Sequence, residues 1–154
     1  ELWASDGWRV MSAESAMIVT RLTPADQRSA LKLEGHVVNT IVHCLRCAID
    51  GELWASFAWR LWELLEPISW LTENAENCQA LAAGGACKEL VRVLVMPEWD
   101  GDMSPRGFSP RGGRVHCVQA LANMAALPAC LAALQGVLIP VAPPEVDVGG
   151  CLAW

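Results

Sequence analysis

Apolar residues recur every three or four positions along much of this chain, which is the spacing of one face of an α-helix. In residues 53–72 this stripe contains Leu61, Leu65 and Ile68. The pattern predicts a helix over residues 53–72 that packs between two neighbours. We expect Pro67 to kink or restart this helix, because proline has no amide hydrogen and its ring crowds the carbonyl four residues earlier.

Two further helices follow in the same unit. Polar residues with capping chemistry precede a short helix predicted over residues 77–83. Gly84 and Gly85 are expected to end it, since glycine accepts the left-handed conformation that closes a helix. A second apolar stripe predicts a helix over residues 86–95, which Pro97 stops.

The three-helix pattern occurs more than once in the chain. Residues 1–9 (ELWASDGWR) return as residues 52–60 (ELWASFAWR), a shift of 52 − 1 = 51. Residues 25–35 align with residues 75–85 at a shift of 50, and a third copy ends at Gly136, which lies 136 − 85 = 51 residues beyond the second. A period near fifty is typical of stacked-repeat proteins.

The first copy follows the same order as the second. A helix is predicted from Pro24 to Leu33, Gly35 breaks it, and a further helix covers residues 37–47. The resulting organisation is three helical units within residues 1–142, a loop insertion in the last two and an irregular C-terminal tail. We place the units at 1–51, 52–107 and 108–142, the loop at 96–114 and the tail at 143–154.

Two segments resemble a known family. Residues 76–94 (ENCQALAAGGACKELVRVL) resemble the junction between the first and second helices of an armadillo repeat, and residues 118–125 (VQALANMA) resemble the end of its third helix. The resemblance covers most of residues 12–142, and HEAT-type helical pairs are the nearest alternative. It implies an all-α fold, an α-solenoid wound as a right-handed superhelix of about three armadillo-like repeats. It also implies a protein–protein interaction scaffold whose third helices line a concave groove for a peptide or partner protein.

In importin-alpha-like members of that family, a Trp and an Asn four residues later recur on the third helices. The Asn holds the peptide backbone, and the Trp rings wall pockets for Lys and Arg stems. Carried onto this sequence, the pair falls at Met17 and Arg21, at Glu66 and Trp70, and at Gln119 and Asn123. Only Asn123 has the expected type, so the resemblance implies a general scaffold and not a nuclear-import receptor.

Four residues of the middle copy share one helical face: Trp59, Trp62, Glu66 and Trp70. One interpretation is that these Trp side chains pack in the core or between repeats. The other is that some of them line the groove, where an aromatic wall beside an acid favours Lys or Arg. The sequence leaves both interpretations open.

Composition narrows the class of partner and the compartment. The chain is 53% hydrophobic and 18% charged, which suits a domain with a sizeable core. A net charge of −6 and a pI near 5.0 provide no basic surface for nucleic acid, so a protein or peptide with basic residues is the expected partner. Seven scattered Cys favour a reducing compartment, cytoplasmic or nuclear. Because both ends of the sequence are apolar and repetitive, we expect a piece of a longer array that self-associates through uncapped repeat ends.

Two other classes of function remain as alternatives. A membrane-associated helical fragment is indicated by the nearly charge-free residues 114–145, although their Pro, Gly and Asn argue against a span. A thiol-dependent metal or redox protein is indicated by Cys44 and Cys47, but zinc sites of this kind need a second Cys pair. His36 and His116 have no acid or nucleophile at a fixed spacing. No enzyme, metal or cofactor is predicted.

The predicted loop contains a tandem pentad that begins at Ser104 and again at Ser109. A flexible insertion explains it most simply. The functional alternative is phosphorylation of these serines by a proline-directed kinase, which would place negative charge beside nearby arginines.

Overall fold

The computed structural model describes residues 5–96 and 110–137, with the backbone alone for residues 110–112. Of these residues 77% are helical and none forms a strand, which confirms the all-α class. The elements in chain order are α1 (Asp6–Leu22), the 3-10 helix η2 (Ala25–Ala30), α2 (Gly35–Asp50), α3 (Leu61–Leu71), α4 (Ala75–Ala83), α5 (Ala86–Val95), α6 (Pro110–Ala125), the 3-10 helix η3 (Pro128–Cys130) and α7 (Leu131–Gln135).

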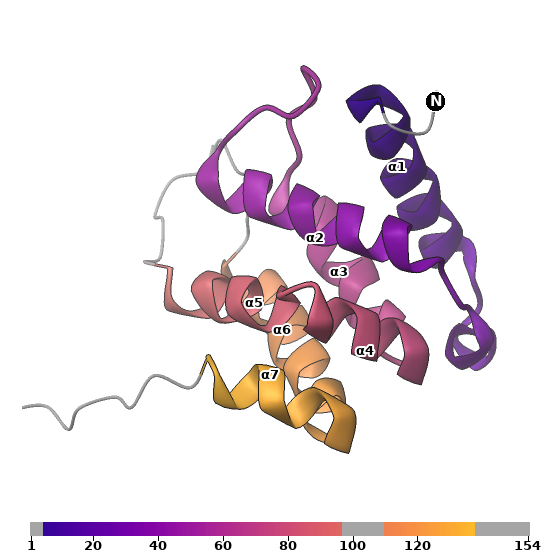
Figure 1. Ribbon diagram of the computed structural model, residues 1–154, viewed down its shortest axis with the longest axis vertical. Coiled ribbons are helices and arrows are strands. Elements are labelled where there is room, and N and C mark those ends of the chain that lie inside the picture. The colour runs from indigo at the N-terminus through magenta and orange to yellow at the C-terminus, as the bar shows by residue number, and fades with distance from the viewer. Residues whose placement is uncertain (1–4, 97–109, 138–154) are drawn as a thin grey trace, which may run out of the picture.

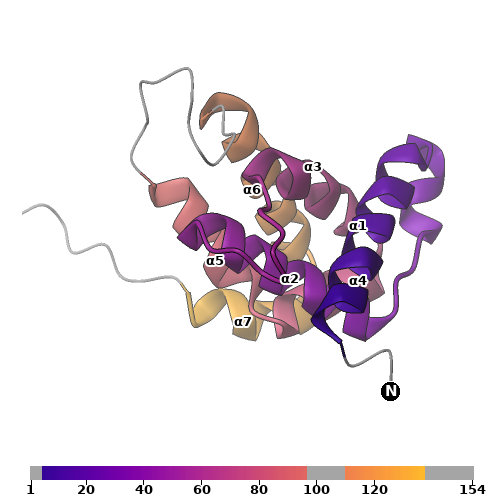
Figure 2. The ribbon, with the colours of Figure 1, turned by 90° about the horizontal axis from the view of Figure 1, so that it is seen from above.

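The helices lie in two rows that follow the chain order. In the first row α3 packs against α1 on one side and against α6 on the other (Figure 2). In the second row α2 packs against α5, and α2 also contacts α1, α3 and α4. The short helices η3 and α7 pack against α4 and α6, so α1 and α7 lie at opposite ends of the structure (Figure 1).

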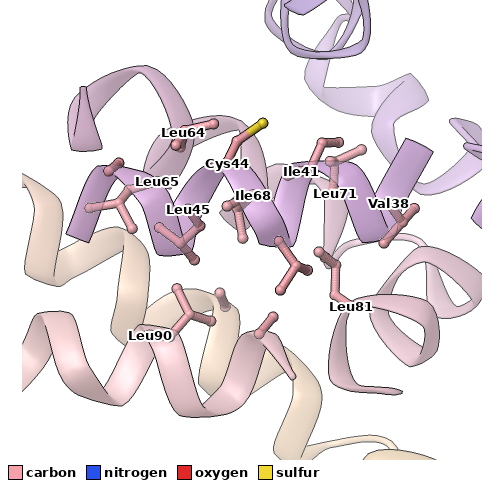
Figure 3. Packing of buried hydrophobic residues seen from close by; sticks show 14 of the residues in the cluster. Val38, Ile41, Cys44, Leu45, Leu64, Leu65, Ile68, Leu71, Leu81 and Leu90 are labelled. Atoms are coloured by element: carbon pink, nitrogen blue, oxygen red, sulfur yellow. The ribbon is translucent and has the colours of Figure 1, made fainter. Parts of the chain in front are cut away.

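The core lies between the two rows. Val38, Ile41 and Leu45 of α2 are spaced by three and four residues and are fully buried. Figure 3 shows them facing leucines and isoleucine from α3, together with leucines of α4 and α5. Burial of each such side chain stabilises the fold by roughly 1.5–3 kcal/mol. The apolar stripes of the sequence therefore hold the two rows together.

The predicted helix over residues 53–72 is wrong in its first half, since α3 begins only at Leu61. Ala55 and Ser56 have φ angles of 48° and 64°, and Trp54 and Phe57 exchange backbone hydrogen bonds of 3.0 and 2.9 Å across this turn. In the first copy Ser5 caps α1 and Asp6 stands in its first turn, where an acid is favourable. Phe57 occupies the position of Asp6 in the second copy. The repeated nine-residue sequence thus has two different structures.

The aromatic residues of this turn pack inward. The Trp54 ring meets the His43 ring edge-on at 4.5 Å, and the Phe57 ring lies 4.9 Å from the Trp59 ring. Packing of these rings fixes the turn, because aromatic pairs contribute about 0.5–1.5 kcal/mol beyond their burial.

Pro67 does not divide α3, which continues through it to Leu71. The carbonyl of Glu63 lacks its usual amide partner, because that partner would be the missing N–H of Pro67. Arg21 of α1 compensates: its Nη2 donates to the Glu63 carbonyl at 3.0 Å and to the Trp62 carbonyl at 3.3 Å. A cross-helix hydrogen bond therefore replaces the one that proline removes.

The first copy also departs from its predicted boundaries. The helix expected to reach Leu33 is a 3-10 helix that ends at Ala30. The side-chain amide of Asn77 accounts for this, since it donates to the Leu31 carbonyl at 2.7 Å and accepts from the Leu33 amide at 2.8 Å. Gly35 does not break a helix but begins α2.

The predicted bounds of α5 and the glycine break before it are confirmed. Gly85 has a φ of 91°, the left-handed conformation expected at this junction. A Cβ atom at Gly84 would lie 2.9 Å from Oδ1 of Asn39, so glycine permits the close approach of α4 to α2. Residues 110–114, predicted as loop, belong to α6. The remaining loop residues 97–109 and the predicted tail at 143–154 lie outside the described residues.

Candidate functional site

The positions matched to the armadillo groove lie on the first row of helices. Met17 and Arg21 are on α1, Glu66 and Trp70 on α3, and Gln119 and Asn123 on α6. Of these Met17 is buried, and the other five are at least partly accessible. We call the surface that they share the row surface.

The predicted stripe of the middle copy divides between core and surface. Trp59 precedes α3, is buried against Phe57 and has no hydrogen-bond partner for its buried Nε1. It therefore belongs to the core and not to a groove. Trp62 is 47% exposed, and Glu66 and Trp70 are partly exposed.

Both accessible tryptophans carry an arginine of the same chain. The Arg21 guanidinium lies 5.3 Å from the centre of the Trp62 ring and 4.0 Å from the Glu66 carboxylate. The Arg28 guanidinium lies 3.8 Å from the centre of the Trp70 ring, and Arg28 is also paired with an acid. An aromatic ring beside an acid does hold a cation here, as its chemistry predicts. The cation is internal, so binding of a ligand cation by these rings stays a prediction.

Asn123 joins α6 to the end of α3. Its Nδ2 donates to Thr72 Oγ1 at 2.9 Å, and its Oδ1 accepts from Gln119 Nε2 at 2.9 Å. One turn earlier, Ser69 Oγ and His116 Nδ1 are 3.1 Å apart across the same two helices. An Asn side chain has two donor hydrogens and two acceptor lone pairs. Asn123 thus keeps one of each for another partner.

A pocket of about 340 Å³ opens beside Asn123. It lies past the C-terminal ends of α3 and α6 and at the start of α4. Its lining residues are Thr72, Glu73, Ala75, Asn123, Ala126 and Leu127.

The pocket has the electrostatics of a cation site. The C-terminal ends of two helices present partly negative carbonyls, and Glu73 adds a carboxylate. The opposing N-terminus of α4 is capped, because Oδ1 of Asn74 accepts from two of its amides at 3.0 Å. Arg28 lies 3.8 Å from Glu73 and shares that carboxylate. Ala and Leu side chains complete the wall, so an alkyl chain with a positive end is the group that this pocket suits.

Sequence reasoning found Asn123 but missed Thr72, Glu73 and Leu127. The polar run from Glu73 to Glu76 was recognised only as helix-cap chemistry. Its position at the junction of α3, α4 and α6 depends on tertiary packing, for which the sequence pattern contains no marker.

The two thiols that suggested a metal or redox protein are buried on α2. Burial, followed by the proximity of Cys47, raises the pKa of Cys44 to about 12, and burial also raises the pKa of Cys47. Both effects disfavour the thiolate that binds metals and reacts. The described part of the chain contains no cluster of three or more His, Cys, Asp or Glu placed to hold a metal ion. His36 pairs instead with Glu34 at 3.2 Å.

The remaining features bear on the membrane and phosphorylation alternatives. None of the described helices is by itself long and apolar enough to cross a membrane, although residues 113–125 and 128–135 meet that criterion jointly as a pair bent by 109°. Ser104 and Ser109 lie outside the described residues.

Comparisons with known proteins add no relative to this picture. No family model matches the chain, and no curated protein or solved structure is significantly similar to it. The fold and the site define an all-helical protein with two ordered rows of helices and a polar, electronegative pocket on the first row.

Proposed function

We propose that the chain is an armadillo-like solenoid that serves as a protein–protein interaction scaffold and holds a basic peptide or partner segment along the row surface. The three pairs of aligned groove positions fall on α1, α3 and α6, which pack side by side in chain order. A second row, α2 and α5, follows the same order. Such an arrangement is typical of stacked helical repeats, in which each unit contacts its neighbours.

The observation that carries the proposal is Asn123 at the mouth of the 340 Å³ pocket. The free donor and acceptor of its amide suit a peptide backbone, and the Glu73 carboxylate suits a Lys or Arg side chain that enters the pocket. Trp62 and Glu66 extend the same surface along α3. Since few groups contact the peptide, we expect micromolar or weaker affinity, roughly −8 kcal/mol or less in magnitude.

A fluorescence anisotropy titration tests this proposal. The probe is a labelled octapeptide in which Lys alternates with Ala, and the comparison peptide has Gln in place of each Lys. We expect measurable binding of the Lys peptide alone, weaker at high salt because the attraction is partly screened. Glu73→Gln should weaken it by about threefold or more.

The matched control is Glu14→Gln, an exposed acid on α1 outside the pocket. It changes the net charge equally but should leave the dissociation constant nearly unchanged. Equal binding of both peptides, or an equal loss in both variants, would show that the attraction is not specific to this pocket.

A further inference from the structure

The two sides of α3 and the outer side of α6 occupy equivalent positions in the repeat. The alignment that pairs Glu66 with Gln119 has a shift of 119 − 66 = 53. On α3 the residues Leu65, Ser69 and Thr72 are buried. Two of them bond α6 directly, since Ser69 meets His116 and Thr72 accepts from Asn123. This side of α3 is therefore its contact surface for the next helix of the row.

At the equivalent positions α6 exposes small apolar residues. Leu65 corresponds to Val118, which is 56% exposed, and Ser69 and Thr72 correspond to the exposed Ala122 and Ala125. These three residues are spaced by four and three positions, so they form one stripe. We call this stripe the tail face. It repeats the side of α3 that packs against a following helix.

The first helix of the row exposes the complementary side. With the shift of 66 − 17 = 49 that pairs Met17 with Glu66, Pro67 corresponds to Ile18 and Leu71 to Leu22. Pro67 and Leu71 are buried, whereas Ile18 is 50% and Leu22 is 77% exposed.

Pro67 lies on the side of α3 that faces the preceding helix, because the carbonyl that it leaves open accepts from Arg21 of α1. We call the stripe of Met11, Ser15, Ile18 and Leu22 the head face. Large apolar side chains exposed in such a stripe typically mark an interaction surface.

We propose that the head face of one copy of this chain binds the tail face of the next copy, so that the row continues from one molecule into another. Each face is equivalent to one half of the contact that α3 already makes within the chain, which is why a second copy is the occupant. Their sizes also fit: Ile18, Leu22 and Met11 are large, whereas Val118 and two alanines on the tail face permit close approach.

A contact between two different faces is heterologous, and it does not close on itself unless the rotation between copies forms a ring. Assembly should therefore grow with concentration beyond a dimer. This contact lies apart from Glu73 and the pocket, so it does not depend on the proposed peptide binding.

Two variants that each block one face test the proposal by sedimentation velocity. Ile18→Glu places a charge on the head face, and Val118→Glu places one on the tail face. Desolvation of an unpaired carboxylate is costly, so each should weaken association by at least about tenfold. Both positions are exposed, and circular dichroism should show wild-type helix content. Gln79→Glu, at an exposed position of α4, is the matched control and should assemble as the wild type does.

The mixture of the two variants gives the discriminating result. Each variant alone should be monomeric, but Ile18→Glu keeps an intact tail face and Val118→Glu keeps an intact head face. Together they should form a one-to-one dimer and nothing larger. A variant that still dimerises alone would indicate a symmetric contact and overturn the proposal. A mixture that stays monomeric, or a wild-type chain that is monomeric at every concentration, would overturn it as well.

Discussion

The middle helix α3 and the last long helix α6 have the same core side and different flanks. Leu64 and Leu71 of α3 correspond to Cys117 and Met124 of α6, and all four are buried. On the flank, Leu65 is buried against the next helix, whereas its counterpart Val118 is largely exposed. The core side is thus set by each helix and the second row, while the burial of a flank depends on whether a neighbour is present. The pocket beside Asn123 forms where such a neighbour, α3, is present.

Truncation at the equivalent flank positions should have very different effects. Leu65→Ala leaves a cavity between packed helices and should lower the free energy of unfolding by about 2–5 kcal/mol. Val118→Ala removes mainly exposed surface and should change it by less than about 0.5 kcal/mol in the monomer. Urea denaturation at low protein concentration measures both. Similar losses would show that the two flanks are not different in burial.

Removal of the Arg21 side chain should weaken the contact between α1 and α3. Arg21→Ala leaves the Glu63 carbonyl without its partner, and we expect a loss of about 1–3 kcal/mol in unfolding free energy. α6 has Ala120 at the position of Pro67, and it needs no such arginine.

The control is the same change in a Pro67→Ala background, where an alanine amide can bond the Glu63 carbonyl. There Arg21→Ala should cost about 1 kcal/mol less. An equal cost in both backgrounds would mean that Arg21 acts through Trp62 and Glu66 alone.

A smaller effect distinguishes the two core sides at alkaline pH. Burial raises the pKa of the Cys117 thiol from 9.0 to about 12, so the folded protein holds a neutral thiol where the unfolded chain ionises. This contribution to stability is complete below pH 9 and is lost as the pH rises toward 12. Between pH 8 and 10 the wild type should lose about 1 kcal/mol more than Cys117→Ala.

Leu64→Ala is the matched variant on α3, because it truncates the equivalent core residue without removing a thiol. Its difference from the wild type should be the same at both pH values. Denaturation curves that show the same pH dependence for Cys117→Ala and the wild type would exclude this role of the thiol.

The sequence pattern was sufficient for the helical class, the limits of α5 and the break at Gly85, since these depend on local periodicity and backbone conformation. It failed at residues 53–60, because the same nine-residue sequence is helical beside Asp6 and forms a turn beside Phe57. It could not show that Arg21 and Arg28 cover Trp62 and Trp70, because these contacts join residues about forty positions apart. The site residues Thr72 and Glu73 escaped notice for the same reason.

The most direct test of the central claim is a map of peptide binding on the protein by NMR. Titration of the alternating Lys–Ala octapeptide into the ¹⁵N-labelled chain should shift the side-chain amide signals of Asn123 and Gln119, the Trp62 indole signal and the backbone amide of Glu73. Val118→Glu provides a background in which self-association is reduced. Shifts confined to the row surface are the result that we predict. Shifts confined to α2 and α5, or none at a saturating peptide concentration, would contradict the proposed function.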